Sequence, residues 1–519
     1  MSQPSSPNNR PNVLMVLADQ LNAQWMGCAG HPQALTPRLD AFAASAMRFE
    51  AAYCQNPICT PSRVSILSGQ YCQNHGYYGL SGPAPRLDNL FRHFRANGYR
   101  TAAYGKLHLP ESPRNWIADD VDDFGDAYET ADGVFGESAF LKNLERKGLR
   151  EWEDSWHNEK QYGPGTIAID ATPSKLPLEE TMEMWAARQA MDFMAAADGQ
   201  PFCIQLALQK PHHPLLPNQR FWDLYPEDLD LPETWDDAPT GRPPHFRQRW
   251  DEWQQYPPEF GHPGENHEDF VQRCWRGTLA CVSQIDHVFG LLLDFLHAQG
   301  LEKNTIVIFG SDHGAYHGLY GILEKAPGIC SEAVCRVPLL WRAPGITPAG
   351  SRCDHLVENV DLTPTLNALC GLPAFEAADG LDVTPLLRGE NAPLRKISVT
   401  ENVWSKALRW KQWRFVHYQP EHFQGEDHGE LYNLADDPHE RHNLYMDPGH
   451  APVVQNCRRL LLEWLIRTRR SVTTQSSIHQ PRGASYVKGS HFTYATTDDG
   501  TAPTSQQAPH RNDINRYYL

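Results

Sequence analysis

The stretch NVLMVLAD, from Asn12 to Asp19, is an unbroken apolar run that ends in a carboxylate. Such a run is typical of a parallel strand that is buried on both faces of a sheet. Ligand sites of open α/β sheets lie beyond the carboxyl ends of the strands. The stretch therefore predicts a buried parallel sheet, with Asp19 at the edge where functional side chains gather.

Helical and strand patterns alternate along much of the chain that follows this run. Alternation of this kind is typical of a parallel sheet covered by helices on both faces. We therefore predict an α/β fold with a large mixed, mostly parallel sheet flanked by helices. The expected elements are a helix over 36–46 and the helix and strand pairs 87–96 with 100–104, 179–197 with 202–208, and 268–297 with 305–309.

The pattern changes after about Pro393, where short strand candidates replace the longer alternation. A chain of 519 residues also exceeds the size at which one core usually keeps growing. The strand candidates are 396–400, 407–410 and 413–418, and a helix is expected over 452–467. These elements predict a smaller C-terminal α+β subdomain.

We accordingly divide the chain into a catalytic α/β domain (1–393), the α+β subdomain (394–470) and a polar tail (471–519). The tail has too few apolar residues to fold alone, so we expect it to dock on the body or on a neighbouring subunit of a homo-oligomer. The segment 223–263 is dense in Pro, Trp and charge, which predicts a long functional loop or a small insertion that could cover a cleft.

Composition excludes several classes of protein. The chain has 46 Lys and Arg against 63 Asp and Glu, for a net charge of −17, and no basic block stands out. Nucleic acid is therefore not an expected partner. The N-terminus lacks an apolar signal segment and no later apolar run approaches the length needed to span a bilayer, so we expect a cytoplasmic protein that does not enter membranes. The 12 Cys lack paired CxxC spacing, which argues against both disulfides and structural zinc.

The segment CTPSRVSILSG, from Cys59 to Gly69, follows a turn-rich stretch and opens a helical pattern. Cys59 should lie at a helix N-terminus, where the helix dipole and free N–H groups favour an anion. The segment resembles the Cys-x-Pro-Ser-Arg signature of the sulfatases of the alkaline phosphatase superfamily. The resemblance implies an alkaline phosphatase-like fold and hydrolysis of a sulfate monoester, R-O-SO3.

The resemblance further implies that a formylglycine-generating enzyme converts Cys59 to an aldehyde, which hydrates to a gem-diol. One hydroxyl would attack sulfur, and the other would later expel sulfate as the aldehyde re-forms. Arg63 would bind an oxygen of the modified residue and fix its geometry.

Asp312 and His313 follow the strand expected over 305–309, so they share the sheet edge with Asp19. The resemblance implies that these residues, Gln20 and the oxygen of modified Cys59 hold one divalent cation. Many sulfatases carry Asp-Asp and Asp-Asn at the two pairs, whereas this chain is similar to choline sulfatases and phosphonate monoester hydrolases. We expect Ca²⁺ and retain Mn²⁺ as an alternative, because an imidazole ligand also suits softer ions. Whether Gln20 is a ligand stays open.

Three basic segments complete the resemblance. Lys106 and His108 lie in a Gly-Lys-x-His element, where an extended backbone would turn both side chains to one face. Lys106 would bind a sulfuryl oxygen and His108 would take a proton during sulfate release. His212, in a Pro-His-x-Pro element, would protonate the leaving oxygen or bind sulfate, and Lys325 would bind the substrate anion.

Two rival functions remain open at this point. A phosphonate monoester or phosphodiester hydrolase would bind its tetrahedral phosphoryl group with a similar cation and similar side chains. That branch, however, has Tyr and Thr where this chain has Lys106 and His108. A non-catalytic anion-binding protein would keep Cys59 unconverted. Choline, aryl and carbohydrate sulfates remain equally open as substrates, because loop composition does not specify a ligand.

Overall fold

The computed structural model describes residues 10–80, 87–110, 116–127, 138–152, 171–254, 265–325 and 329–470. The tail 471–519 lies outside these residues, so its docking stays a prediction. The segment 223–263 contains helix α10 (Pro244–Gln254), which agrees with a small insertion rather than with a loop alone. Residues 255–264 lie outside the described residues.

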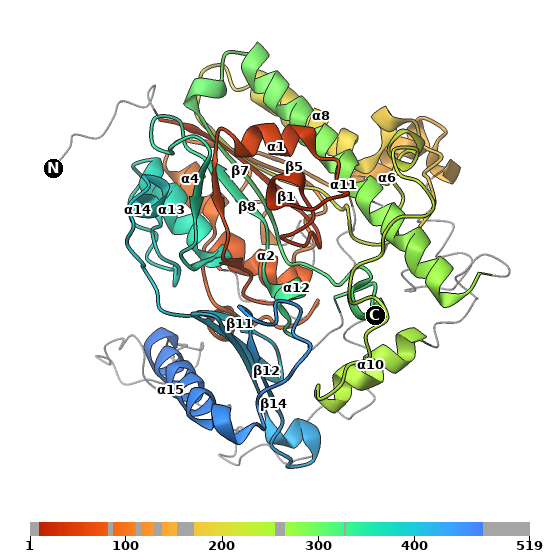
Figure 1. Cartoon of the computed structure of the whole chain (residues 1–519). Coiled ribbons are helices and arrows are strands. Elements are labelled where there is room, and N and C mark those ends of the chain that lie inside the picture. The colour runs from red at the N-terminus through yellow and green to blue at the C-terminus, as the bar shows by residue number, and fades with distance from the viewer. Residues whose placement is uncertain are drawn as a thin grey trace, which may run out of the picture.

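A sheet of eight strands forms the centre of the larger domain, in the order β5-β4-β6-β1-β7-β8-β2-β9 (Figure 1). The first five strands in this order pair in parallel, and β8 is antiparallel to both of its neighbours. The predicted mixed, mostly parallel α/β sheet is therefore confirmed. The strands are β1 (Asn12–Ala18), β2 (Met47–Phe49), β4 (Arg100–Gly105), β5 (Asp123–Asp126), β6 (Phe202–Ala207), β7 (Thr305–Ser311), β8 (Leu339–Arg342) and β9 (Ser351–Cys353).

Strand β1 shows why the sequence forms a covered sheet, because its side chains alternate between two cores. Val13, Met15 and Leu17 belong to a core that includes residues of α2 (Cys59–Ser68), α4 (Leu90–Ala96) and α13 (Leu362–Leu369). Leu14 and Val16 belong to the opposite core, with α1, α8 and α11 (Figure 1). Burial on both faces explains the unbroken apolar run. The other helices of the larger domain are α1 (Pro37–Ala43), α3 (Cys72–His75), α6 (Ala139–Arg146), α8 (Met182–Ala195), α9 (Gln219–Trp222), α11 (His267–Ala298), α12 (Glu332–Cys335) and α14 (Thr384–Leu387).

Helix α11 corrects one expectation about membranes. It is long and apolar enough to cross a bilayer by length and composition, although the sequence seemed to hold no such run. Its most apolar window is 72% buried within the protein. That burial is typical of a core helix, and α11 packs against α1, α8 and α9.

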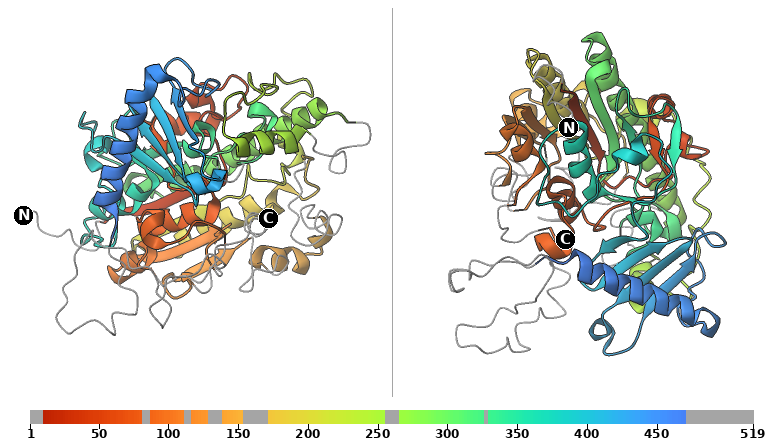
Figure 2. Two further views of the ribbon diagram at one scale, coloured as in Figure 1. Left: turned by 90° about the horizontal axis from the view of Figure 1, so that it is seen from below. Right: turned by 90° about the vertical axis from the view of Figure 1, so that its left-hand side faces the viewer.

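The C-terminal part forms a second, antiparallel sheet in the order β11-β12-β13-β14. Helix α15 (Ala451–Thr468) lies along one face of it, as both views of Figure 2 show. A separate apolar core joins this helix and the sheet. The α+β character of this region is confirmed, whereas the exact domain boundaries stay a prediction. The strands are β11 (Ser398–Glu401), β12 (Ser405–Trp410), β13 (Trp413–Tyr418) and β14 (Gly429–Asn433).

Candidate active site

Cys59 is the first residue of α2, as the sequence predicted, and it is fully buried. Its Sγ lies 3.1 Å from Nε2 of His313 and 3.6 Å from Oδ1 of Asp19. This sulfur stands where the oxygens of a formylglycine side chain would be. Three segments far apart in sequence therefore meet at one point.

Asp19, Cys59, Asp312 and His313 each bring one possible ligand atom within 4.8 Å of the other three. All four are buried. Asp19 follows the last residue of β1, and Asp312 and His313 follow the last residue of β7. Two carboxylates, an imidazole and the side chain of residue 59 at this spacing make a donor set that fits a divalent cation.

The ring of His313 is oriented for ligation. Its Nδ1 lies 2.8 Å from the carbonyl oxygen of Gly314, which requires the proton on Nδ1 and leaves Nε2 toward the cluster. Burial alone would lower the pKa of this imidazole, but neighbouring Asp312 and Cys59 raise it above its usual value. A cation at Nε2 would take the place of that proton.

Arg63 lies behind the carboxylates and is fully buried. Its Nε donates to Asp312 at 2.8 Å, and its Nη2 donates to Asp19 at 3.0 Å. Its Nη1 donates to the backbone carbonyl of Lys106. The guanidinium thus fixes both acids relative to α2, while its expected contact with the modified residue stays a prediction.

Lys106 lies directly after β4 and is completely buried rather than on the surface. Its Nζ is 2.8 Å from Oδ2 of Asp19. Burial would raise the pKa of Asp19, yet the charges of Lys106 and Arg63 hold it well below its usual value. Asp19 is therefore a carboxylate at neutral pH.

His108 shows one wrong expectation about the backbone. Its φ is +43°, and Gly105 has a φ of +98°, so the segment is not extended. A Cβ at residue 105 would lie 1.9 Å from the carbonyl oxygen of Ala207, which explains the glycine. Thr60 donates to the carbonyl oxygen of His108 at 3.1 Å and so ties this turn to α2.

The imidazole of His108 is buried near the cluster. Burial lowers its pKa well below the usual value, and the charges of Lys106, Arg63 and Lys325 lower it further against the opposing effect of Asp19. His108 is therefore neutral at neutral pH and can accept a proton.

His212 and Lys325 contact each other. Nζ of Lys325 lies 3.3 Å from Nε2 of His212, and Nδ1 of His212 lies 2.7 Å from the carbonyl oxygen of His213. Burial, Lys106 and Lys325 hold the pKa of His212 well below its usual value. Nδ1 thus carries the proton of a neutral ring, and Nε2 accepts from Lys325.

Gln20 also lies in this group, with a left-handed φ of +70°. Its Oε1 accepts from Lys325 at 3.1 Å, so its place as a cation ligand stays a prediction. Glu324 pairs with Arg249 at 3.3 Å, which leaves the ammonium of Lys325 directed toward the site.

Sequence reasoning missed several supporting residues. Nδ2 of Asn359 donates to the carbonyl oxygen of Ser311 at 3.1 Å, and Ser62 donates to that of Asp312 at 2.5 Å. Nε2 of His317 lies 3.1 Å from the carbonyl oxygen of Gln20. Ser62 could have been found from its place in the CTPSR segment, whereas Asn359 and His317 carry no local signal.

Comparison with known proteins agrees with this geometry. Residues 11–372 match the sulfatase family, and residues 320–466 match the C-terminal region of N-sulphoglucosamine sulphohydrolase. The chain belongs to the sulfatase family. It is a sulfuric ester hydrolase of alkaline phosphatase-like fold, as the sequence predicted.

Named relatives cover most of this sulfatase. A sulfatase of Formosa agariphila is 28% identical over 83% of this chain and 82% of its own. The choline-sulfatase of Rhizobium meliloti is 26% identical over 86% and 84% of the two chains. The phosphonate monoester hydrolase of Agrobacterium radiobacter has a similar fold, with a TM-score of 0.71 at 21% identity over 88% of this chain and 95% of its own.

Proposed function

We propose that this sulfatase hydrolyses a sulfate monoester with a formylglycine made from Cys59 and with one divalent cation held by Asp19, Asp312 and His313. The observation that carries the proposal is that Cys59 lies beside three buried side chains that could hold a cation. A cysteine buried only for packing behaves as a small apolar residue and would not require two carboxylates and an imidazole around it.

The cation would lower the pKa of a hydroxyl on residue 59 and offset charge on the sulfuryl oxygens. The modification, made by a formylglycine-generating enzyme, would supply a second hydroxyl that an unmodified Cys or Ser lacks. The two carboxylates suit Ca²⁺, which we expect, and the imidazole is the reason to keep Mn²⁺ as the alternative. The amide oxygen of Gln20 could become a further cation ligand if the side chain rotated away from Lys325.

Positive charge around the cluster supports binding of an anion. Lys106, Arg63 and Lys325 face two carboxylates, so cationic side chains are in excess even before a cation binds. Burial of these groups strengthens their effect on an incoming sulfuryl group. We assign Lys106 and Lys325 the role of binding the oxygens of the sulfuryl group.

Proton transfer falls to two histidines. Neutral His108 would accept the proton from the second hydroxyl of residue 59 during sulfate release. His212 cannot donate from Nε2 in the tautomer described, so the Lys325 and His212 pair together would deliver a proton to the leaving oxygen.

The substrate class is a small-molecule or carbohydrate sulfate ester. The choline-sulfatase of Rhizobium meliloti and an arylsulfatase of Clostridium perfringens are similar to this chain to nearly the same degree. Choline and aryl sulfates are therefore both candidate substrates, beside carbohydrate sulfates. A phosphonate or phosphodiester activity on the same site is the second candidate, favoured by the fold of the phosphonate monoester hydrolase. We retain the expectation of a cytoplasmic homo-oligomer.

Mass spectrometry of the peptide that contains Cys59 tests the nucleophile. After co-expression with a formylglycine-generating enzyme, we expect an aldehyde in place of the thiol. The same sample would be assayed on choline, aryl and sugar sulfates beside phosphonate and phosphodiester analogues, and kcat/KM should be highest for a sulfate ester. An unconverted thiol in an active enzyme, or faster phosphodiester cleavage, would overturn the proposal.

A further inference from the structure

Three buried cysteines form a second cluster of thiols, away from Cys59. Cys54 follows β3 (Ala52–Tyr53), Cys335 ends α12, and Cys330 precedes that helix. Each side chain is at most 2% exposed. All are free thiols.

The sulfur of Cys335 lies at the centre of this cluster. Nη2 of Arg414 donates to it at 3.2 Å. Burial would raise the pKa of the Cys335 thiol, but the neighbouring Cys330 and Cys54 thiols and the charge of Arg414 bring it well below its usual value. Cys335 therefore has the surroundings of a thiolate nucleophile.

Cys54 and Cys335 lie directly opposite each other across an antiparallel contact. Tyr53 and Arg336 form an antiparallel bridge, which makes Cys54 and Cys335 the next opposed pair. The backbone N–H of Cys54 donates to the carbonyl oxygen of Cys335 at 2.9 Å. Cα atoms of opposed residues lie about 4.5–5.5 Å apart, inside the range of about 4.4–6.8 Å that a disulfide requires.

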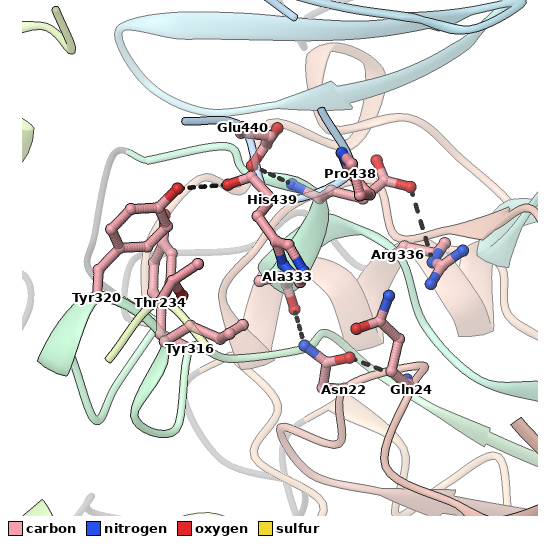
Figure 3. A pocket seen from close by; sticks show the side chains of 12 residues that line it. Asn22, Gln24, Thr234, Tyr316, Tyr320, Ala333, Arg336, Pro438, His439 and Glu440 are labelled. Carbon is pink, nitrogen blue, oxygen red and sulfur yellow. Dashed lines mark hydrogen bonds and ion pairs between the residues drawn. The ribbon is translucent and has the colours of Figure 1, made fainter. Parts of the chain in front are cut away.

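A small polar pocket is linked to this cluster through one ion pair. It opens between α12 and the loop at residues 438–440, and Figure 3 shows Glu440 and Arg336 on its wall. Its free space is about 30 Å³, enough for a molecule of the size of one or two waters. Glu440 also pairs with Arg414 at 2.9 Å, so one ion pair separates the pocket from the sulfur of Cys335.

We propose that Cys335 is a peroxide-reactive thiolate that forms a reversible disulfide with Cys54. The thiolate attacks one oxygen of hydrogen peroxide, the O–O bond breaks, and hydroxide leaves to give a sulfenic acid. The thiol of Cys54 then attacks that sulfur, an S–S bond forms, and water leaves. In total, two thiols lose two electrons and two protons, and the peroxide becomes two waters.

The bond would join α12 to the segment that leads into the active site. Cys54 lies five residues before Cys59, and Val334, beside Cys335, accepts the N–H of Gly314 at 2.7 Å. A dithiol reductant would restore both thiols. The modification is independent of sulfate ester hydrolysis, so its test does not depend on the nature of the nucleophile.

The test treats the full-length protein with hydrogen peroxide, removes the excess with catalase, and alkylates all remaining thiols under denaturing conditions. Mass spectrometry of the digest should then show a peptide pair joined through Cys54 and Cys335, lost on reduction. Cys203 is an internal control, because its thiol is buried with a raised pKa and should stay fully alkylated.

Two variants sharpen the result. Cys335→Ser should abolish the linked peptide, whereas Cys330→Ser should retain it as the matched control. Full alkylation of Cys54 and Cys335 in peroxide-treated, folded wild-type protein would overturn the proposal, and so would a bond between Cys330 and Cys335. The wild-type digest decides the matter alone if a variant fails to fold.

Discussion

Two clusters of charged side chains have different charge balances. At the carboxyl edge of the large sheet, three cationic side chains surround two carboxylates: Lys106, Arg63 and Lys325 against Asp19 and Asp312. Between the large sheet and the C-terminal sheet, three carboxylates pair with three guanidinium groups: Glu332, Glu430 and Glu440 with Arg242, Arg336 and Arg414.

The difference explains why similar residue types serve different purposes. The edge cluster has positive charge in excess and a set of cation ligands, which suits an anion that binds and leaves. The second cluster joins two parts of the chain with equal numbers of carboxylates and guanidinium groups, and burial raises the pKa of the Glu440 carboxyl to about 7. Substitutions in the first should change turnover, and substitutions in the second should change stability.

The largest effect is expected for Cys59→Ala. Loss of the nucleophile should lower kcat by at least about 10⁴-fold while leaving the thermal unfolding temperature within a few degrees of wild type. Steady-state kinetics on the best sulfate ester and a melting curve measure both. Cys28→Ala, on a partly exposed cysteine, is the control and should keep wild-type turnover.

Asp312→Asn should have the next largest effect. It removes one charged cation ligand and one partner of Arg63, so bound divalent metal should fall from one ion per chain toward none, with kcat reduced about 10³-fold. Elemental analysis of the purified protein gives the metal content. Exposed Asp251→Asn serves as the comparison, and an unchanged metal content in Asp312→Asn would refute the ligand assignment.

Arg414→Met should destabilise the fold instead. The substitution removes one of the two cationic partners of buried Glu440 and of half-buried Glu332, which should cost at most about 3–5 kcal/mol of unfolding free energy. Denaturant unfolding measures the loss, and Arg459→Met, which removes a surface ion pair with Glu463, should cost less than about 1 kcal/mol. Equal losses of unfolding free energy in the two variants would contradict the claim that ion pairs between the two sheets stabilise the fold more than surface ion pairs do.

The smallest effect concerns the pH dependence of stability. Folded Glu440 keeps its proton up to about pH 7, whereas the unfolded chain releases it near 4.5, so this group favours folding at low pH. Its contribution should fall by roughly 3 kcal/mol at most between about pH 5 and pH 8. Glu440→Gln should flatten the curve of melting temperature against pH in that window. Parallel curves for both proteins would contradict the raised pKa.

The sequence predicted those parts of the site that local patterns encode. Two apolar runs, each followed by an aspartate, predicted β1 with Asp19 and β7 with Asp312. The CTPSR segment predicted the start of α2. Strands β2 and β5 were missed, because three or four residues carry too little periodicity. The backbone of His108 was missed for another reason, since a left-handed residue after a glycine breaks any alternation.

The second charged cluster could not be predicted at all. Arg414 and Glu440 lie about 80 to 110 residues from Glu332 in sequence, and only the packing of the two sheets brings them together. Asn359 and His317 act through backbone carbonyls, so no side-chain motif marks them. Tertiary contacts of this kind are absent from the spacing of residue types.

We propose that residue 59 becomes covalently sulfated in a buried site where neutral His108 is the base. The direct measurement mixes His108→Ala enzyme with a sulfate ester, quenches the reaction in acid, and weighs the peptide that contains residue 59. Because this variant lacks the base for sulfate release, that peptide should gain the mass of one SO3 group in step with one burst of released alcohol. Continued turnover without any adduct on residue 59 would contradict the account.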